Sequence, residues 1–393
     1  MNDNTLRVGI NLLWLVPGVV GGTEEYATRQ LEALAKHRPP GIAFTVFALA
    51  PFADAYPELT TAFDTVTIPL RGRVKPLRVA VENTWLAWQS RRHSLDVLHH
   101  LGGRIPRLSR VPPVVTIHDL QPLEQPQSFS IAKRLFLGRA LPQTARRARI
   151  VITPTEYVRA RVIERFTLSA DRVVALFAPV SVRKVPTPRP EVLPPAVAAL
   201  VDTRTPFFLL PAITYRYKNH RTVLDAFAGL REDRPDVRLV LTGGPGDAED
   251  AVRAHIADLG LGESVLRTGR VPRPVLDLLL DHAVALVFPS RFEGFGLPVL
   301  EAMAAGCPVV ASNVTALPEV VADAGTLVPP DDPAAWRAAM AQQLVASRGD
   351  AAAAGRRRAA AFGSESIANG LAAVYRAAAS ARPRDEARDD RDR

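Results

Sequence analysis

Residues 284–311 read VALVFPSRFEGFGLPVLEAMAAGCPVVA, and this stretch predicts a strand, a glycine-rich loop, a helix and a second strand. Val284–Phe288 is an apolar run of strand length that stops at a proline. Pro298 stands where a helix begins, because the first helical position needs no backbone N–H. Gly306 stands where a left-handed residue ends that helix, and Pro308–Ala311 supplies the next strand. A strand that returns through a helix predicts a parallel sheet.

The same alternation of short strands and amphipathic helices runs along the rest of the chain. Glu24–His37 carries Ala27, Leu31 and Leu34 at the spacing of one helix face. Strands that alternate with helices indicate parallel sheets with helices on both faces, so the fold class is α/β. The other strands are expected at Leu6–Asn11, Phe44–Leu49, Asp96–His99, Val114–Ile117, Ile150–Thr153, Val173–Leu176, Phe207–Pro211, Val237–Thr242, Ser264–Thr268 and Thr326–Val328.

Two helix starts can be predicted from capping chemistry. Residues 153–156, Thr-Pro-Thr-Glu, have the pattern of a capping box with Thr153 as N-cap and Glu156 at the third helical position. Asp332-Pro333 has the pattern of an N-cap followed by the first helical residue.

The length of the chain predicts two domains, because 393 residues exceed one ordinary core. Residues 182–206 hold many prolines and few strand formers, which is typical of a linker. We expect an N-terminal Rossmann-like domain over residues 1–185, a linker over 186–205, a C-terminal Rossmann-like domain over 206–364 and a disordered tail over 380–393. Open parallel sheets bind ligands beyond the carboxyl ends of their strands, so a cleft between the domains is the expected ligand site.

Composition and charge limit the classes of function. Hydrophobic residues make up 47% and charged residues 23%, as in water-soluble proteins. We find no apolar run of membrane-span length and no signal-peptide pattern, and the single Cys307 indicates a reducing compartment, so we expect a cytoplasmic protein. The net charge of +9 is spread along the chain without a nucleic-acid-binding signature, and we therefore expect no nucleic-acid partner.

One basic and aromatic segment leaves membrane contact open. Its basic residues are Arg71, Arg73, Lys75, Arg78, Arg91 and Arg92, and its large apolar residues are Trp85, Leu86 and Trp88. Basic side chains beside exposed aromatic rings suit an anionic bilayer and would make the protein peripheral at the inner membrane face. The alternative is a basic surface loop followed by a helix whose tryptophans pack inward.

The loop and helix over residues 289–305 can bind a nucleotide-sugar. Backbone N–H groups at a helix start attract a diphosphate, and the carboxylates of Glu293, before the loop, and Glu301, expected in the first helical turn, can accept hydrogen bonds from vicinal hydroxyls. Taken singly, each residue has a structural alternative: Glu301 complements the helix dipole, Glu293 is solvated, and Gly294 and Gly296 form a turn. Together at this spacing they favour the nucleotide-sugar.

The stretch EGFGLPVLE is an E-x7-E motif from Glu293 to Glu301, and it resembles the retaining GT-B glycosyltransferases of family GT4. The continuation over residues 302–333 and the stretch GGTEEYATRQLEALA from Gly21 also resemble that family. The resemblance extends from Leu6 to Ala379. It implies a GT-B fold, with two doubly wound Rossmann-like domains facing a central cleft and a helix at about residues 365–379 that packs back on the first domain.

The resemblance also implies roles for matching residues. Glu301 would hold the donor ribose and Glu293 would lie near the hydroxyls of the transferred sugar. Backbone groups would contact the donor at Gly21, Gly22, Val271, Gly294, Phe295, Gly296 and Leu297. His118, after an N-terminal strand, matches the donor-sugar histidine of the family, and its alternative is a structural hydrogen-bonded histidine.

One position departs from the family pattern, which has an Arg and, five residues later, a Lys on the diphosphate. Residues 211–220 read PAITYRYKNH, so Lys218 matches the Lys, whereas Ile213 occupies the Arg position. Arg216 is a candidate for the missing charge, and its alternative is a surface arginine. We therefore expect His118, Lys218 and Glu293 to be catalytic, and we expect no metal and no cofactor because no Asp-x-Asp motif lies near the donor site.

The resemblance implies retaining transfer of a hexosyl group from a nucleotide-diphosphate sugar, GDP-mannose ahead of a UDP-sugar, to an unidentified hydroxyl acceptor. That acceptor is a glycan, a lipid-linked molecule or a small molecule. Non-catalytic binding of the nucleotide-sugar and another reaction on it, such as epimerisation, are the alternatives. An NAD-dependent oxidoreductase is disfavoured because the glycines at 18–22 and 243–246 lack the G-x-G-x-x-G spacing.

Overall fold

The computed structural model describes residues 5–19, 21–125, 131–180 and 193–380, which form two compact units. Unit 1 comprises Met1–Pro154, Val158–Ala178 and Ser364–Arg393, and unit 2 comprises Thr155–Tyr157 and Pro179–Gly363. The expected domain border at residue 185, the first part of the expected linker and the tail from residue 381 lie outside the described residues. The remainder of the expected linker contains a helix, Pro195–Asp202 (α9), which belongs to unit 2.

Unit 1 contains a seven-stranded parallel sheet in the order β3-β2-β1-β4-β5-β6-β7. Its strands are β1 (Leu6–Asn11), β2 (Ile42–Leu49), β3 (Asp64–Ile68), β4 (Val97–His100), β5 (Pro113–Thr116), β6 (Ile150–Thr153) and β7 (Val173–Ala175). The strand order reverses at β1, which pairs with both β2 and β4. A reversal of this kind opens a ligand crevice at the carboxyl ends of the two strands, which here are Asn11 and His100.

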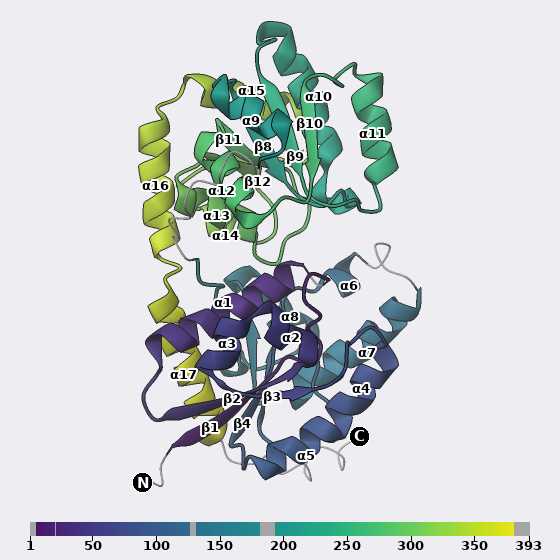
Figure 1. Cartoon of the computed structure of the whole chain (residues 1–393), viewed down its shortest axis with the longest axis vertical. Coiled ribbons are helices and arrows are strands. Elements are labelled where there is room, and N and C mark those ends of the chain that lie inside the picture. Colours follow the sequence, from purple (N-terminus) through teal and green to yellow (C-terminus); the bar gives the residue numbers. More distant parts are fainter. Residues whose placement is uncertain (1–4, 20, 126–130, 181–192, 381–393) are drawn as a thin grey trace. The chain divides into compact units, whose positions relative to one another are not determined.

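The helices of unit 1 cover its sheet (Figure 1). They are α1 (Gly22–His37), α2 (Ala50–Ala55), α3 (Pro57–Ala62), α4 (Lys75–Asn83), α5 (Trp85–Arg92), α6 (Gln121–Glu124), α7 (Ile131–Arg147), most of α8 (Glu156–Phe166) and α17 (Ser364–Ser380). The last helix, α17, packs against α1 although it is far away in sequence. Its Tyr375 is fully buried, and the Tyr375 hydroxyl lies 2.9 Å from Nδ1 of His99 in β4.

Unit 2 contains a six-stranded parallel sheet in the order β10-β9-β8-β11-β12-β13. Its strands are β8 (Phe207–Pro211), β9 (Arg238–Thr242), β10 (Val265–Gly269), β11 (Ala285–Phe288), β12 (Val309–Ser312) and β13 (Thr326–Val328). The order reverses at β8, which pairs with β9 and β11. The second crevice therefore lies where β8 ends at Pro211 and β11 ends at Phe288.

Besides α9, the helices of unit 2 are α10 (His220–Asp233), α11 (Glu249–Asp258), α12 (Arg273–His282), α13 (Leu297–Ala305), α14 (Leu317–Val321), α15 (Pro333–Val345) and α16 (Arg348–Ala360). Helix α13 is almost wholly buried, with α16 packed beside it. Gly355 allows this approach, since a Cβ at that position would lie 3.3 Å from the Met303 backbone. Burial on several sides fixes the helix start that faces the crevice.

Every strand expected from the sequence is present within two residues at each end, but the edge strand β3 was not expected. Its sequence, DTVTI, mixes polar and apolar residues without an apolar run, and its side chains are half-buried or exposed. The expected capping box at Thr153 is wrong: Thr153 is the last, buried residue of β6, and α8 begins at Glu156. The Asp332 cap is confirmed, because its Oδ1 accepts a hydrogen bond of 3.0 Å from the Ala335 amide.

Candidate functional site

Lys218 and Glu293 form an ion pair at the crevice of unit 2. Lys218 Nζ lies 2.5 Å from Glu293 Oε1, and the two side chains are 15% and 12% exposed. The ammonium group also faces the rings of Phe288 and Tyr217, with centroids at 4.9 and 5.1 Å, an arrangement that favours a cation. The structure therefore brings two of the three expected catalytic residues into contact, one from the loop after β8 and one from the loop after β11.

The loop after β8 is held in place by a second polar cluster. Thr214 Oγ1 donates to Glu249 Oε2 at 2.8 Å and accepts from the Gly246 amide at 2.7 Å. Hydrogen bonds from Arg253, and then from Thr214 and Arg267, lower the pKa of Glu249 to about 2 despite the opposing effect of desolvation. These bonds tie the segment before Lys218 to the loop after β9.

Gly296 shapes the start of α13. Its φ of +89° is left-handed, and a Cβ would lie 2.6 Å from Leu317 Cδ2, so both conformation and space require glycine. Gly296 is the N-cap and provides no side-chain cap, which leaves no capping group to compete with an anion at this helix start. The predicted donor contacts Gly294, Phe295 and Leu297 lie in the same turn, and Gly306 ends the helix with φ +77° as predicted.

Glu301 lies deeper in α13 than the sequence suggested. The helix begins at Leu297, so Glu301 is its fifth residue and not part of the first turn. A helix-dipole role is weak there, because that effect falls off beyond the first turn. Glu301 is 7% exposed and forms an ion pair with Arg273, the first residue of α12.

Arg273, which sequence reasoning missed, contacts the candidate site through Glu301. Its Nε also donates to Asp277 at 2.7 Å, so the guanidinium joins two carboxylates. Its position in the sequence could have pointed to it, because Arg273 follows the predicted donor contact Val271 by two residues. Val271 is half-buried in the segment between β10 and α12. Arg273 neutralises Glu301 and fixes the orientation of its carboxylate.

Arg216 does not join the Lys218–Glu293 pair. Its side chain is 81% exposed, and its Nε lies 3.9 Å from Asp247 Oδ2. Ile213, at the position where the family pattern has Arg, is half-buried. The structure therefore places Lys218, and not Arg216, against Glu293.

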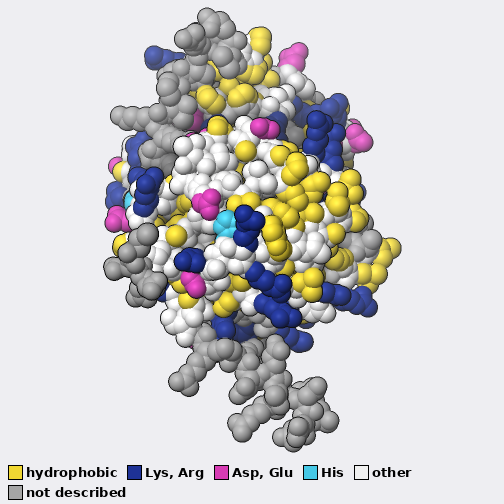
Figure 2. Space-filling model, turned by 60° about the horizontal axis from the view of Figure 1, so that its bottom comes forward, with side chains coloured by type: hydrophobic (Ala, Val, Ile, Leu, Met, Phe, Trp, Pro, Cys, Tyr) yellow, Lys and Arg dark blue, Asp and Glu magenta, His cyan; other side chains and the backbone are white. Residues whose placement is uncertain are grey.

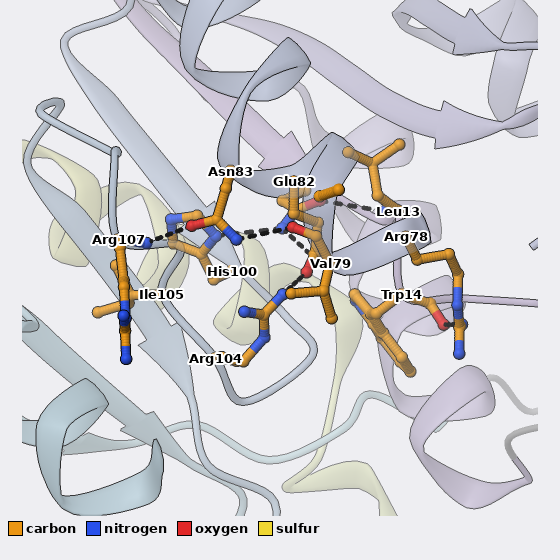
Figure 3. Close-up of polar contacts among 12 residues, drawn as sticks. Leu13, Trp14, Arg78, Val79, Glu82, Asn83, His100, Arg104, Ile105 and Arg107 are labelled. Carbon is orange, nitrogen blue, oxygen red and sulfur yellow. Dashed lines mark hydrogen bonds and ion pairs between the residues drawn. The ribbon is translucent and has the colours of Figure 1, made fainter. Parts of the chain in front are cut away.

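In unit 1, a buried polar network occupies the crevice between β1 and β4. Asn11 Nδ2 lies 3.3 Å from Glu82 Oε1 and 3.2 Å from His100 Nδ1, while Arg104 forms an ion pair with Glu82 (Figure 3). Burial lowers the pKa of His100 to about 3, with a smaller contribution from Arg147. The network thus contains a neutral histidine, His100, and a carboxylate, Glu82, whose charge is balanced by Arg104.

His118 is half-buried just beyond the end of β5. Its Nε2 lies 2.7 Å from the Leu101 carbonyl, and its ring meets Tyr26 of α1 edge-on at 4.9 Å. Burial lowers the pKa of His118 to about 4, so the ring is neutral at pH 7. Because a carbonyl can only accept, Nε2 carries the proton and Nδ1 is left as an acceptor.

Gly21 and Gly22 begin α1 in the same unit. Gly21 is its N-cap with φ +65°, a conformation that suits glycine. Glu24, which sequence reasoning missed, closes this loop: its two carboxylate oxygens accept from the Gly18 amide at 2.9 Å, and Oε1 also accepts from the Tyr56 hydroxyl at 2.6 Å. Glu24 is 6% exposed, so its role is to hold the loop.

The basic segment 71–92 has features of both alternatives, membrane contact and a helix whose tryptophans pack inward. Leu86 is buried and Trp85 packs against the same hydrophobic core. Trp88, in contrast, is 52% exposed, with the Arg92 guanidinium 5.4 Å from its ring centroid. Arg78 donates to the Trp14 carbonyl at 2.6 Å and is partly buried, so it serves the fold.

Neither a metal-ligand cluster nor a membrane-spanning helix is present among the described residues. No group of three or more His, Cys, Asp or Glu side chains in that part of the chain is arranged to hold a metal ion. No helix there combines the length and apolar character needed to cross a membrane.

Comparison with known proteins places both halves of the chain in related families. The family described as Glycosyl transferases group 1 matches residues 198–358, and the one described as Glycosyltransferase Family 4 matches residues 20–183. O-antigen chain mannosyltransferase B of Escherichia coli is 34% identical over 261 residues, which span 66% of this chain and 68% of that protein. O-antigen chain mannosyltransferase RfbU of Salmonella typhimurium is 25% identical over 301 residues, 73% of this chain and 78% of that protein.

Solved structures show the same fold. The crystal structure of Anabaena HepE with UDP and glucose matches with a TM-score of 0.70 and 18% identity, covering 94% of this chain and 99% of that one. A glycosyltransferase from Rickettsia africae matches with a TM-score of 0.70 and 15% identity, covering 96% and 100%. Two parallel-sheet α/β units with this likeness have the GT-B fold.

Proposed function

The chain belongs to glycosyltransferase family 4, and from this premise we propose that it is a retaining, metal-independent mannosyltransferase that uses GDP-mannose to extend a glycan. The family makes it a hexosyltransferase. Mannose is supported by the E. coli and Salmonella relatives, which are named O-antigen chain mannosyltransferases. A UDP-sugar is the second candidate donor, because HepE was solved with UDP and glucose.

The observation that carries this proposal is the Lys218–Glu293 pair in the loop region before α13. The N-cap of that helix, Gly296, offers no side-chain hydrogen bond to the first backbone amides. In the reaction, the bond between the sugar and the nucleoside diphosphate breaks and negative charge collects on the leaving phosphate. Lys218 would turn from Glu293 to that phosphate, joined by backbone amides of the Gly294–Leu297 turn. Glu293, once released, would accept hydrogen bonds from sugar hydroxyls, so the ion pair keeps both groups ready without a ligand.

The nucleoside part is assigned to Glu301 and the Val271 turn. A carboxylate accepts two hydroxyl hydrogen bonds well, and Arg273 keeps Glu301 oriented. Arg216 remains a proposed diphosphate contact that would have to leave solvent and Asp247 to reach the donor. Positive charge from Lys218 and the helix start would replace the metal ion that other transferases use.

In unit 1, His118 is proposed to contact the transferred sugar. Its Nδ1 can accept a hydrogen bond from a hydroxyl because Nε2 is committed to Leu101. Neutral at physiological pH, it would orient the sugar and not exchange protons with it. Gly21 and Gly22 are proposed to bring backbone amides near the donor phosphates or the acceptor. The leaving phosphate would take the acceptor proton, which keeps the same face for entry and departure.

A thermal-shift panel tests the donor assignment directly. The purified protein is heated with GDP, UDP, ADP or dTDP and the matching sugar conjugates in the presence of EDTA, since a ligand that binds the folded state raises its stability. We expect a selective shift with GDP and GDP-mannose that Glu301→Ala reduces. Asp277→Ala is the matched control, because it removes a carboxylate from the same arginine without removing the proposed ribose ligand.

The outcome separates the alternatives. A shift with UDP alone would move the donor to a UDP-sugar, and no shift with any nucleotide from a folded sample would overturn the donor site. Product analysis without acceptor then distinguishes transfer from epimerisation, which would convert the donor sugar on its own. Anomeric analysis of the transfer product decides retention.

A second proposal is peripheral membrane contact through segment 71–92, made by fewer of its residues than the sequence suggested. Val74, Leu77 and Trp88 are 59%, 46% and 52% exposed, beside the exposed Arg71 and Arg73. Co-sedimentation with anionic liposomes should fall when Arg71 and Arg73 are reversed to Glu. Arg78 is left intact because it supports the fold.

A further inference from the structure

A cavity of about 270 Å³ lies in unit 1 between α7 and the segment that follows β4. Arg104 and Arg107 line it from that segment, and Arg139 and Arg147 line it from α7. Among the described residues, no carboxylate lines this cavity. Four arginines around one hollow without an acidic side chain provide strong attraction for an anion.

The four arginines differ in the contacts that their side chains already make. Arg104 is paired with Glu82, and Arg147 donates to the carbonyls of Pro106 and Arg107 at 3.1 and 3.2 Å. The other two guanidinium groups, those of Arg107 and Arg139, contact no acidic side chain in the described part of the chain. The backbone of Arg107 is engaged on both sides: its amide donates to Asn83 Oδ1 at 2.7 Å and its carbonyl accepts from Arg147. Its side chain extends away from Asn83 in Figure 3.

An exposed apolar edge adjoins these charges. Leu135 and Phe136 line the cavity and are 55% and 52% exposed, and Ile131, one turn earlier on α7, is 70% exposed. Figure 2 shows one face of the molecule on which hydrophobic side chains lie beside groups of Lys and Arg. Exposed large apolar residues next to a basic hollow match a molecule with an anionic head and an apolar chain.

We infer that this cavity binds the phosphate headgroup of an anionic phospholipid, with Arg107 and Arg139 on the phosphate and Ile131, Leu135 and Phe136 in the apolar layer. A phosphodiester accepts the planar, forked hydrogen bonds that guanidinium groups donate. Leucine and phenylalanine at the mouth would gain by leaving water for acyl chains. The inference is independent of the proposed transfer reaction and of segment 71–92, since neither is needed for the headgroup to bind.

Vesicle binding without donor or acceptor tests the site. The full chain is mixed with vesicles of phosphatidylcholine alone or of phosphatidylcholine and phosphatidylglycerol in equal parts, and partitioning is measured by flotation. Arg107→Gln/Arg139→Gln should reduce partitioning to the anionic vesicles by about 30-fold, since each basic contact contributes about fivefold. The matched control, Arg165→Gln/Arg357→Gln, removes the same charge from two exposed arginines outside the cavity and should change partitioning by less than about twofold.

Two further arms define the ligand. Leu135→Ser/Phe136→Ser, at exposed positions that should leave folding intact, should also weaken partitioning while leaving calorimetric binding of soluble glycerol 3-phosphate unchanged. The inference is overturned if both double-arginine variants lose partitioning equally, because the attraction would then be general charge. It is also overturned if glycerol 3-phosphate binds but anionic vesicles do not, which would make the cavity a site for a soluble phosphate ester.

Discussion

The carboxyl ends of the two parallel sheets are built from different chemistry. In unit 1, Asn11, His99 and His100 are buried, and burial keeps both histidines neutral. In unit 2, the corresponding edge holds two ion pairs, Lys218 with Glu293 and Arg273 with Glu301. The unit 1 edge therefore combines buried neutral histidines with one ion pair, Arg104–Glu82, whereas the candidate site at the unit 2 edge is made of opposite charges.

This difference indicates how each edge can respond to a ligand. An ion pair such as Lys218–Glu293 can exchange its partner for a phosphate or a hydroxyl, because both groups regain an equivalent contact. A buried hydrogen-bonded network such as that of Asn11 and His100 loses hydrogen bonds when any member moves. We therefore expect unit 2 to reorganise on donor binding and unit 1 to present its groups, such as His118, in fixed positions.

The largest effect should come from Lys218→Ala. Losing one preorganised donor to a developing negative charge costs about 10²–10³ in kcat, and α13 cannot move to replace it because it is buried. Steady-state kinetics with the donor identified by thermal shift measure this change. Lys218→Arg is the control that keeps the charge, and it should recover part of the rate. Near-normal kcat for Lys218→Ala would remove Lys218 from the catalytic set.

The two glutamates of the motif should separate nucleotide binding from transfer. Glu301→Gln should weaken GDP binding by about 10-fold or more, since a hydrogen bond to a charged group contributes about 1.5–3 kcal/mol. Glu293→Gln should leave GDP binding unchanged or tighter, because Lys218 loses its competing partner. Titration calorimetry with GDP compares them directly. Equal losses in both variants would contradict the assignment of Glu301 to ribose and Glu293 to sugar.

The sequence predicts the local parts of this comparison and misses the long-range ones. The ends of α13 at Gly296 and Gly306 follow from backbone rules that involve neighbouring residues only. The Arg273–Glu301 pair joins two helices, and no local pattern announces which arginine meets a given carboxylate. The predicted capping box was wrong for a related reason. Residues 153–156 fit the capping-box pattern, but Thr153 pairs with Ala175 of β7, which extends β6 through the predicted N-cap.

Burial of neutral histidines in unit 1 predicts that acid destabilises the protein. The pKa of His118 is lowered to about 4 and those of His99 and His100 to about 3, all chiefly by burial. Between these values and the unfolded value of about 6.5, the unfolded chain binds more protons than the native one. The stability from keeping them neutral is therefore complete above about pH 6.5 and lost as pH falls toward 4.

Denaturant unfolding at pH 7.5 and 5 measures this loss, which has an upper limit of about 1.4 kcal/mol per pH unit for each histidine. His118→Gln removes one titrating group from a half-buried position and should make the decline shallower. A free energy of unfolding that stays constant over this range would mean that the histidines ionise in the folded protein, and the description of them as held neutral by burial would fail.

The smallest effect should come from Arg216→Ala, which tests whether unit 2 recruits a second cation. Its side chain is mostly in solvent and its contact with Asp247 is long, so little stability is lost with it. Ordering a flexible arginine onto the diphosphate costs side-chain entropy that offsets much of the attraction. We therefore expect kcat/KM to fall by only about threefold. A loss as large as that of Lys218→Ala would show that Arg216 moves to the donor and supplies the charge that Ile213 lacks, and donor binding would then reorganise the whole loop after β8.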